Sequence, residues 1–243
     1  MAVDSPVLIS GWWVYLRSGL GSTHLNPSAE QINNAYRVRT GLQQQGYNEI
    51  SIAGVLGNMQ VESGLSAGCL QNIGAHLAHL PNQGEHLADL TNSVIQQYWC
   101  SSSNYGYGTG LIQWDIRSNT NKIADFAIAN NSVWYSGALQ LYKLDTEFQH
   151  DNNNPDDPWF WFGDYHETWA EFKQYTGTPE NAADIFRVNR ERGGNDSIQI
   201  RKDNARYWYD YFIANPNPPV EPWLLMCFNN KRKEVLKNVR KYI

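Results

Sequence analysis

The chain has 243 residues, of which 42% are hydrophobic and 18% are charged, and its formal net charge is −5 at pH 7. This length is sufficient to bury the core of one globular domain with additional segments. The acidic balance argues against nucleic acid as the main partner, because binding to phosphates requires a basic surface.

Residues 1–27 are predicted to form an irregular N-terminal extension. Its aromatic side chains, among them Trp12 and Trp13, are expected to pack on the domain that follows. The apolar run at residues 6–15 has no basic segment before it and is too short to span a membrane. We therefore expect neither a secretory signal nor a membrane span here.

A mainly α-helical domain is predicted over residues 28–214. Its first helix is expected to run from Ser28 to about Gln45, because Ser28 and Gln31 have the spacing of a capping box. Few segments have a sequence pattern typical of strands, so we expect at most a small hairpin, near residues 105–113.

The second predicted helix ends in an acidic residue. Four apolar side chains at helical spacing predict one buried face, namely Ile52, Val55, Leu56 and Met59. Ser51 can cap the start of this helix, and Gly64 lies where a helix-ending glycine belongs. Glu62 continues the apolar series, so it lies at the edge of the buried face in the last turn.

The position of Glu62 at this helix end has a chemical consequence. Partial burial and the negative end of the helix dipole both favour the protonated form of its carboxyl group. A protonated glutamic acid is the group that donates a proton to a glycosidic oxygen. Taken alone, a glutamate here would more simply be a solvated residue at a helix end.

A glycine-rich segment at residues 106–114 is predicted to form a turn that presents the amide of Gln113 and the indole of Trp114. Together with a carboxyl group, such side chains build a sugar-binding cleft. Aromatic residues make up 13% of the chain, which favours carbohydrate binding only modestly, because small cores use them too. The densest aromatic patch, residues 159–162 with Tyr165 and Trp169, is either a glycan platform, a partner contact or part of the core.

Further helices are predicted toward the C-terminus, at residues 119–130, at residues 137–149, from Pro179 to Arg192, and from Asp196 or Ser197 onward. Pro179 follows Thr178, and proline is favoured at the first position of a helix. A variable region with short helices is expected at residues 65–105.

Three motifs, in this order, resemble the phage tail lysozyme family, which is related to goose-type lysozymes and soluble lytic transglycosylases. They are Gly-Asn-x-x-x-Glu-Ser-Gly at residues 57–64, Gly-Leu-x-Gln-Trp at residues 110–114, and Asn-x-Glu-Arg at residues 189–192. The resemblance covers residues 28–214 and implies a lysozyme-like α+β fold that is mainly α-helical. It also implies a tail-associated enzyme of a bacteriophage particle that acts on the host cell wall during DNA entry and uses no cofactor.

The implied reaction is cleavage of the β-1,4 bond between N-acetylmuramic acid and N-acetylglucosamine in peptidoglycan. In the resemblance, Glu62 is the general acid, Ser63 supports it, Gln113 contacts the sugar and Trp114 packs beside the cleft. The residues expected to bind substrate are Gln113, Ser63, Trp114, Tyr107 and Glu191.

The identity of the second carboxylate in the reaction stays open. Asp115 would either hold the attacking water as a catalytic base or cap the following turn. Glu191 would either take that role or, as we prefer, pair with Arg187, Arg192 or Arg201 and join two helices. A functional Asp115 favours hydrolysis, whereas a missing second carboxylate favours a lytic transglycosylase, in which the muramic C6 hydroxyl attacks. A phage endolysin and a non-catalytic tail component are the remaining alternatives.

The last segment, residues 215–243, is predicted to be a Pro-rich linker followed by a basic helix. Residues 216–243 contain six basic and two acidic residues, which gives this segment a net charge of +4. This helix either docks on the acidic domain or binds another tail protein, a membrane surface or packaged DNA.

Cysteines and histidines define no further site. The chain has three cysteines, and either a bridge between Cys69 and Cys100 or reduced thiols would fit. A histidine group, His76, His79 and His86, lacks a complete set of metal ligands, so no metal is expected.

Overall fold

The computed structural model is mainly α-helical, as the sequence predicts. It describes residues 7–14, 17–18, 26–70, 87–98, 108–114, 123–147, 159, 164–191 and 197–217. In chain order the helices are α1 (Ala29–Gln44), α2 (Glu49–Ser63), the 3₁₀ helix η3 (Leu87–Asp89), α4 (Asn92–Tyr98), α5 (Ile123–Ala129), α6 (Gly137–Glu147), α7 (Trp169–Lys173), α8 (Pro179–Phe186), the π-helix η5 (Arg187–Glu191) and α9 (Ile198–Ala214). Among these described helices, none is both long and apolar enough to cross a bilayer.

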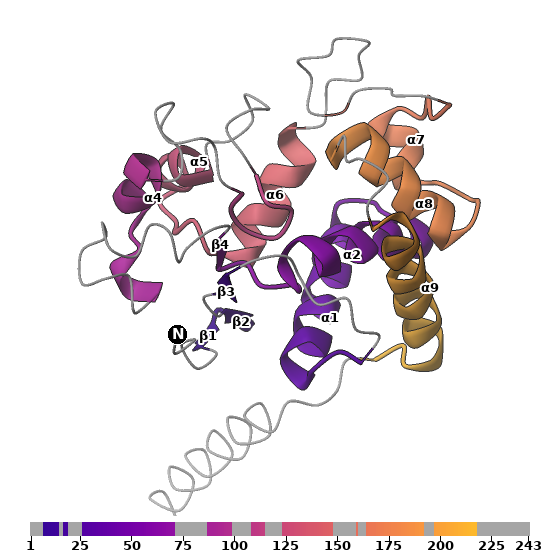
Figure 1. Cartoon of the computed structure of the whole chain (residues 1–243), viewed down its shortest axis with the longest axis horizontal. Helices are drawn as coiled ribbons and strands as arrows, with labels where there is room; N and C mark the ends of the chain where they lie inside the picture. The colour runs from indigo at the N-terminus through magenta and orange to yellow at the C-terminus, as the bar shows by residue number, and fades with distance from the viewer. Residues whose placement is uncertain are drawn as a thin grey trace, which may run out of the picture.

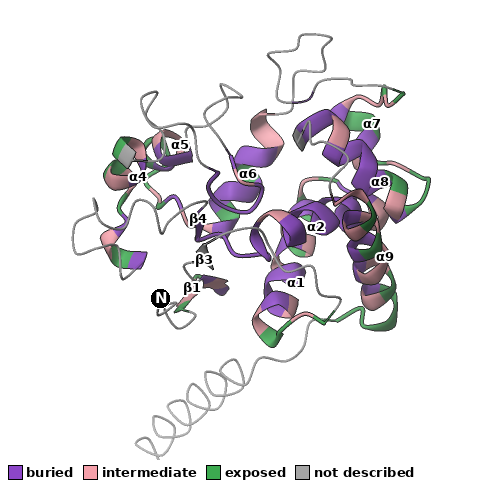
Figure 2. Cartoon of the chain, in the orientation of Figure 1, coloured by how far each residue is buried: buried purple, intermediate pink, exposed green. Residues whose placement is uncertain are grey.

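Helix α2 is the centre of the fold (Figure 1). It contacts α1, α8 and α9, while α4 and α5 contact each other, with α5 joined to the rest through α6. Figure 2 shows that α2 is buried along almost its whole length, so its apolar residues are covered on more than the one face predicted. A helix enclosed in this way fixes the position of whatever its last turn carries.

The ends of the first two helices test the predicted capping residues. Ser28 and Gln31 form the predicted capping box at the start of α1. Helix α2 begins earlier than predicted, because Asn48 is its N-cap and the Asn48 side chain accepts a hydrogen bond from the Ser51 backbone. The prediction that Ser51 caps this helix was therefore wrong. Gly64 ends it in the left-handed conformation, with φ of 59°, as predicted.

The strands among the described residues are short. They are β1 (Val7–Ile9), β2 (Trp12–Val14), β3 (Arg17–Ser18) and β4 (Cys69–Leu70). Strands β1 and β2 pair in antiparallel fashion around Ser10 and Gly11, whose φ angles of 50° and 85° suit a two-residue hairpin turn. Strand β3 pairs in parallel with β4.

The hairpin of β1 and β2 is docked on α1 by asparagine side chains. Asn34 accepts a hydrogen bond from the backbone N–H of Trp13 at 2.9 Å and donates one to the Trp13 carbonyl at 2.7 Å. Asn33 donates to the carbonyl of Gly11 at 3.1 Å. Trp12 is buried, which confirms its predicted packing on the domain. The prediction of an irregular extension was wrong for residues 7–14, because these distant contacts stabilise a hairpin there.

Aromatic side chains fill the core under α7 and α8. The rings of Trp159 and Trp169 lie 4.6 Å apart, and both are buried together with Phe172 and Phe186. The indole of Trp159 also donates to the carbonyl of Glu167 at 2.9 Å. Of the alternatives for the aromatic patch, the core interpretation is thus confirmed for Trp159 and Trp169; residues 160–162 lie outside the described residues.

The helix predicted from Pro179 begins there, with Thr178 as its N-cap. It changes to a π-helix at Arg187 instead of continuing as one α-helix. Asp184 accepts hydrogen bonds from Arg187 at 2.8 Å and from Lys202 of α9 at 2.9 Å. Burial raises the pKa of the Asp184 carboxyl group, but the bonds from Lys202 and Arg187 more than offset this and lower it overall. Asp184 therefore links α8 to α9 as an ionised carboxylate.

Candidate active site

The last two turns of α2 carry the first motif, and each of its polar or glycine positions has a separate physical task. Gly57 lies where α2 crosses α9. A Cβ atom at this position would be 2.5 Å from the carbonyl oxygen of Arg201 and 2.9 Å from the Cβ of Ala205. Glycine is thus required for the close approach of the two helices.

Asn58 is fully buried and joins three helices. Its amide nitrogen donates to the carbonyl oxygens of Gly54 and Ala183, both at 2.9 Å. Its amide oxygen accepts a hydrogen bond from Nη1 of Arg201 at 2.8 Å. An apolar residue here would leave buried polar groups of α8 and α9 without their partner.

Glu62 faces α9 at the end of α2. Its side chain is 12% exposed, and Oε1 accepts a hydrogen bond from Nη2 of Arg201 within an ion pair. Arg201, one of the predicted partners of Glu191, contacts Glu62 in the structure, and Arg187, another of them, contacts Asp184.

Ser63 connects the end of α2 to the glycine-rich turn. Its hydroxyl oxygen lies 2.9 Å from the carbonyl oxygen of Met59 and 2.9 Å from that of Leu111. Since a hydroxyl group has one proton, it donates to one of the two carbonyls at a time. Ser63 is fully buried, so the expectation that it binds substrate is wrong: its contacts join the turn to α2.

The predicted turn consists of a tight loop closed by two backbone hydrogen bonds between Thr109 and Trp114, each 3.0 Å long. Gly110 has a φ of 78°, which favours glycine. The buried side chain of Gln140, in α6, accepts a bond from the Leu111 N–H at 2.8 Å and donates to the carbonyl of Ala67 at 2.8 Å. This role of Gln140 could not be predicted from the sequence, because a glutamine inside a helix carries no local signal for it.

Gln113 is the residue of this turn that is expected to contact sugar. It is only partly buried, and its side-chain nitrogen donates to the carbonyl of Gly110 at 2.8 Å. Its φ of 50° is unusual for a residue other than glycine. Strained backbone of this kind is concentrated at functional sites, where the surrounding structure maintains it.

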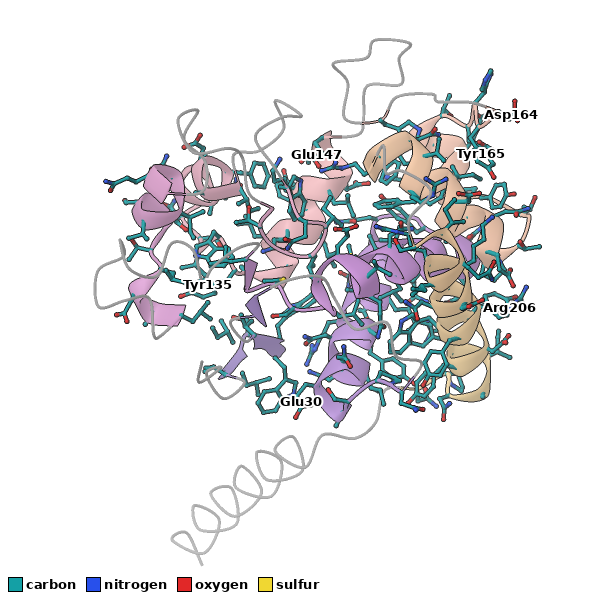
Figure 3. The ribbon with its side chains drawn as sticks, viewed as in Figure 1. Glu30, Tyr135, Glu147, Asp164, Tyr165 and Arg206 are labelled. Atoms are coloured by element: carbon teal, nitrogen blue, oxygen red, sulfur yellow. The ribbon has the colours of Figure 1, made fainter. Side chains whose placement is uncertain are left out.

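Trp114 does not line an open surface. It is fully buried, and its indole N–H donates to Oε1 of Glu147 at 2.7 Å. Glu147, at the C-terminal end of α6 (Figure 3), also forms ion pairs with Lys143 and Arg190. The expectation that Trp114 binds substrate is therefore wrong. Its indole joins the turn to a buried cluster of charged residues, which the sequence motifs do not indicate.

Several of the predicted site residues lie outside the described residues. Asp115 and Tyr107 are not among the described residues, nor is the side chain of Glu191. The same is true of Cys100, of the histidine group and of residues 218–243. Their roles stay predictions. Within the described ranges, no group of histidine, cysteine or acidic residues gathers to hold a metal ion.

The bond of Ser63 predicts a measurable effect on stability. Replacing Ser63 with Ala leaves the buried Leu111 carbonyl without this donor and should lower the free energy of unfolding by about 1–3 kcal/mol. Thr146→Ala is the matched control, because among the described residues Thr146 bonds to carbonyls of its own helix and to no other element. Urea unfolding of both variants checks this, and equal losses would contradict the linking role of Ser63.

Comparisons with known proteins find a matching family and a similar phage protein. The sequence profile of a family described as phage tail lysozyme matches residues 33–212. The chain is also similar to Morphogenesis protein 1 of Bacillus phage B103, with 26% identity over 180 residues, which cover 74% of this chain and 39% of that relative. The chain thus corresponds to well under half of the relative's length.

Proposed function

The chain belongs to the phage tail lysozyme family, and we propose that it cleaves the β-1,4 bond between N-acetylmuramic acid and N-acetylglucosamine in peptidoglycan. The observation that carries this proposal is the connection of Glu62 to the turn of Gln113. Ser63, the residue after Glu62, bonds to Leu111 of that turn. The carboxyl group of Glu62 and the partly exposed side chain of Gln113, whose backbone has a strained φ angle, are thereby held on one framework.

The chemistry assigned to Glu62 is proton transfer to the glycosidic oxygen as the bond to the anomeric carbon breaks. Arg201 is bonded to Oε1. A protonated carboxyl group keeps a carbonyl oxygen that accepts hydrogen bonds, so Arg201 can hold Oε1 while Oε2 carries the proton. The anomeric carbon is then attacked by water in a hydrolase, or by the muramic C6 hydroxyl in a lytic transglycosylase.

Release of dye from covalently labelled peptidoglycan sacculi tests the proposal. We expect the purified full-length protein to release soluble dye from sacculi of at least one wall type. A folded protein that binds sacculi of several wall types and releases nothing would contradict it, and would favour a non-catalytic tail component.

We further propose that the protein is part of the phage tail and acts during DNA entry. The family and the similarity to a phage morphogenesis protein support this location. Mass spectrometry of purified phage particles should detect the protein in stoichiometric amounts. Its absence from particles, combined with accumulation in infected cells before lysis, would favour an endolysin instead. Binding of residues 215–243 to another tail protein is part of the same proposal.

A further inference from the structure

We infer that Arg201 is a positioning residue for Glu62: it holds one carboxyl oxygen so that the other is presented for proton transfer. This inference rests on the proposed function, because it assigns to α9 a part in the same reaction. Arg201 lies outside all three sequence motifs.

Three contacts fix the guanidinium of Arg201. Nε donates to the hydroxyl of Ser197 at 3.2 Å, and Nη1 donates to the amide oxygen of Asn58 at 2.8 Å. Nη2 donates to Oε1 of Glu62. Arg201 is 7% exposed, and Asn58 is itself fixed by two carbonyl groups. The guanidinium is therefore held from both helices before it reaches Glu62.

The consequence for Glu62 is geometric. Within the described part of the chain, Arg201 is the only side chain that bonds to its carboxyl group, and it does so through Oε1. With this oxygen fixed, the side-chain torsions of Glu62 and the direction of Oε2 are fixed too. Catalytic groups need such fixation, since an error of about 1 Å in position costs about 100-fold in rate. A lysine cannot reproduce the planar three-point contact of the guanidinium.

The same helix provides a matched control. Arg206 also forms an ion pair with a glutamate of a neighbouring helix, through bonds of 2.6 and 2.8 Å to Glu180 of α8. Its side chain is 42% exposed on the outer side of α9 (Figure 3). Arg206→Gln thus removes an arginine–glutamate pair from α9 without touching the site.

The kinetic test uses soluble peptidoglycan fragments of several disaccharide units. We expect Arg201→Gln to lower kcat about 10- to 100-fold, with KM within about twofold of wild type, because positioning acts on the reacting state. Arg201→Lys should recover part of the loss, and Arg206→Gln should retain the wild-type kcat. If Arg201→Gln does not fold, Arg201→Lys carries the test through a lower kcat at unchanged KM. A wild-type kcat in the Arg201 variants, a change confined to KM, or an equal loss in Arg206→Gln would overturn the inference.

A second readout does not depend on cleavage. In thermal unfolding, the loss of Tm in the double variant Glu62→Gln with Arg201→Gln should be smaller than the sum of the two single losses, because the two side chains are bonded to each other and each single variant already disturbs that contact. Additive losses would mean that Glu62 and Arg201 do not interact, which would overturn the inference. If the wild type releases no product while the losses are non-additive, the proposed function fails and the contact between Arg201 and Glu62 stands.

Discussion

Replacing Glu62 with Gln should reduce the rate at which peptidoglycan is solubilised by about 10²- to 10⁴-fold, the usual contribution of a general acid. Glutamine has nearly the same shape, and its side-chain oxygen can still accept the bond from Arg201. The variant should therefore keep the circular dichroism spectrum of the folded protein. Arg201 loses its counter-charge, so a modest decrease in Tm is expected. Initial rates of dye release from sacculi measure the effect.

Glu49→Gln is the matched control for this variant, because Glu49 lies at the opposite end of the same helix. It is paired with Arg39 at 2.7 Å, with side chains 15% and 33% exposed for Arg39 and Glu49. Loss of this partly exposed pair should leave the rate of cleavage unchanged. A folded Glu62→Gln protein that solubilises sacculi as fast as wild type would exclude Glu62 as the acid.

The second large effect is expected from Gly57→Ala. An added Cβ would lie 2.5 Å from a backbone oxygen of α9, and backbone atoms cannot move aside as a flexible side chain can. Alanine normally stabilises a helix by about 1 kcal/mol relative to glycine. Here the overpacking should exceed this gain and lower the free energy of unfolding by about 3 kcal/mol. Urea unfolding measures the change.

Gly41→Ala separates this clash from the general effect of removing a helical glycine. Gly41 lies inside α1, and its added Cβ would meet the Cδ1 atom of Leu141 at 2.6 Å, which is the end of a flexible side chain. Its free energy of unfolding should stay within about 1 kcal/mol of wild type. If Gly57→Ala is as stable as Gly41→Ala, the helices α2 and α9 are not in the close contact described.

Sequence patterns predict helix ends well where the interacting groups are close together in the sequence. The capping box of Ser28 and Gln31 is confirmed, as is the left-handed Gly64. In both cases the groups that interact lie within a few residues of each other. Where two polar residues compete for one helix start, the pattern is insufficient: Ser51 looked suitable, but Asn48 begins the helix earlier and bonds to the Ser51 backbone.

What could not be predicted depends on contacts between distant segments. Arg201 is 139 positions from Glu62, and Gln140 is 29 positions from the Leu111 that it bonds. Neither residue type indicates its partner, because a buried arginine or glutamine can bond to any acceptor that the fold brings near. The hairpin at residues 7–14 was missed for the same reason, since asparagine side chains of α1 hold it.

The burial of Ser63 and Trp114 also could not be predicted, because it too depends on contacts between distant segments. Both follow directly on residues assigned to the site, yet their side chains are enclosed and bonded to Leu111 and Glu147. A motif does not distinguish a residue that touches a ligand from one that holds its neighbour in place. The fold makes this distinction, and it leaves Glu62 and Gln113 as the described motif residues that are not fully buried.

Mass spectrometry of the fragments released from purified peptidoglycan, with wild type and Glu62→Gln side by side, tests the central claim most directly. Wild type should release fragments that end in N-acetylmuramic acid, and the variant should release almost none. Reducing ends would identify a hydrolase and direct the search for a base to Asp115 and Glu191, whereas 1,6-anhydro ends would identify a lytic transglycosylase. Equal release by both proteins, or fragments that end in N-acetylglucosamine, would contradict the account.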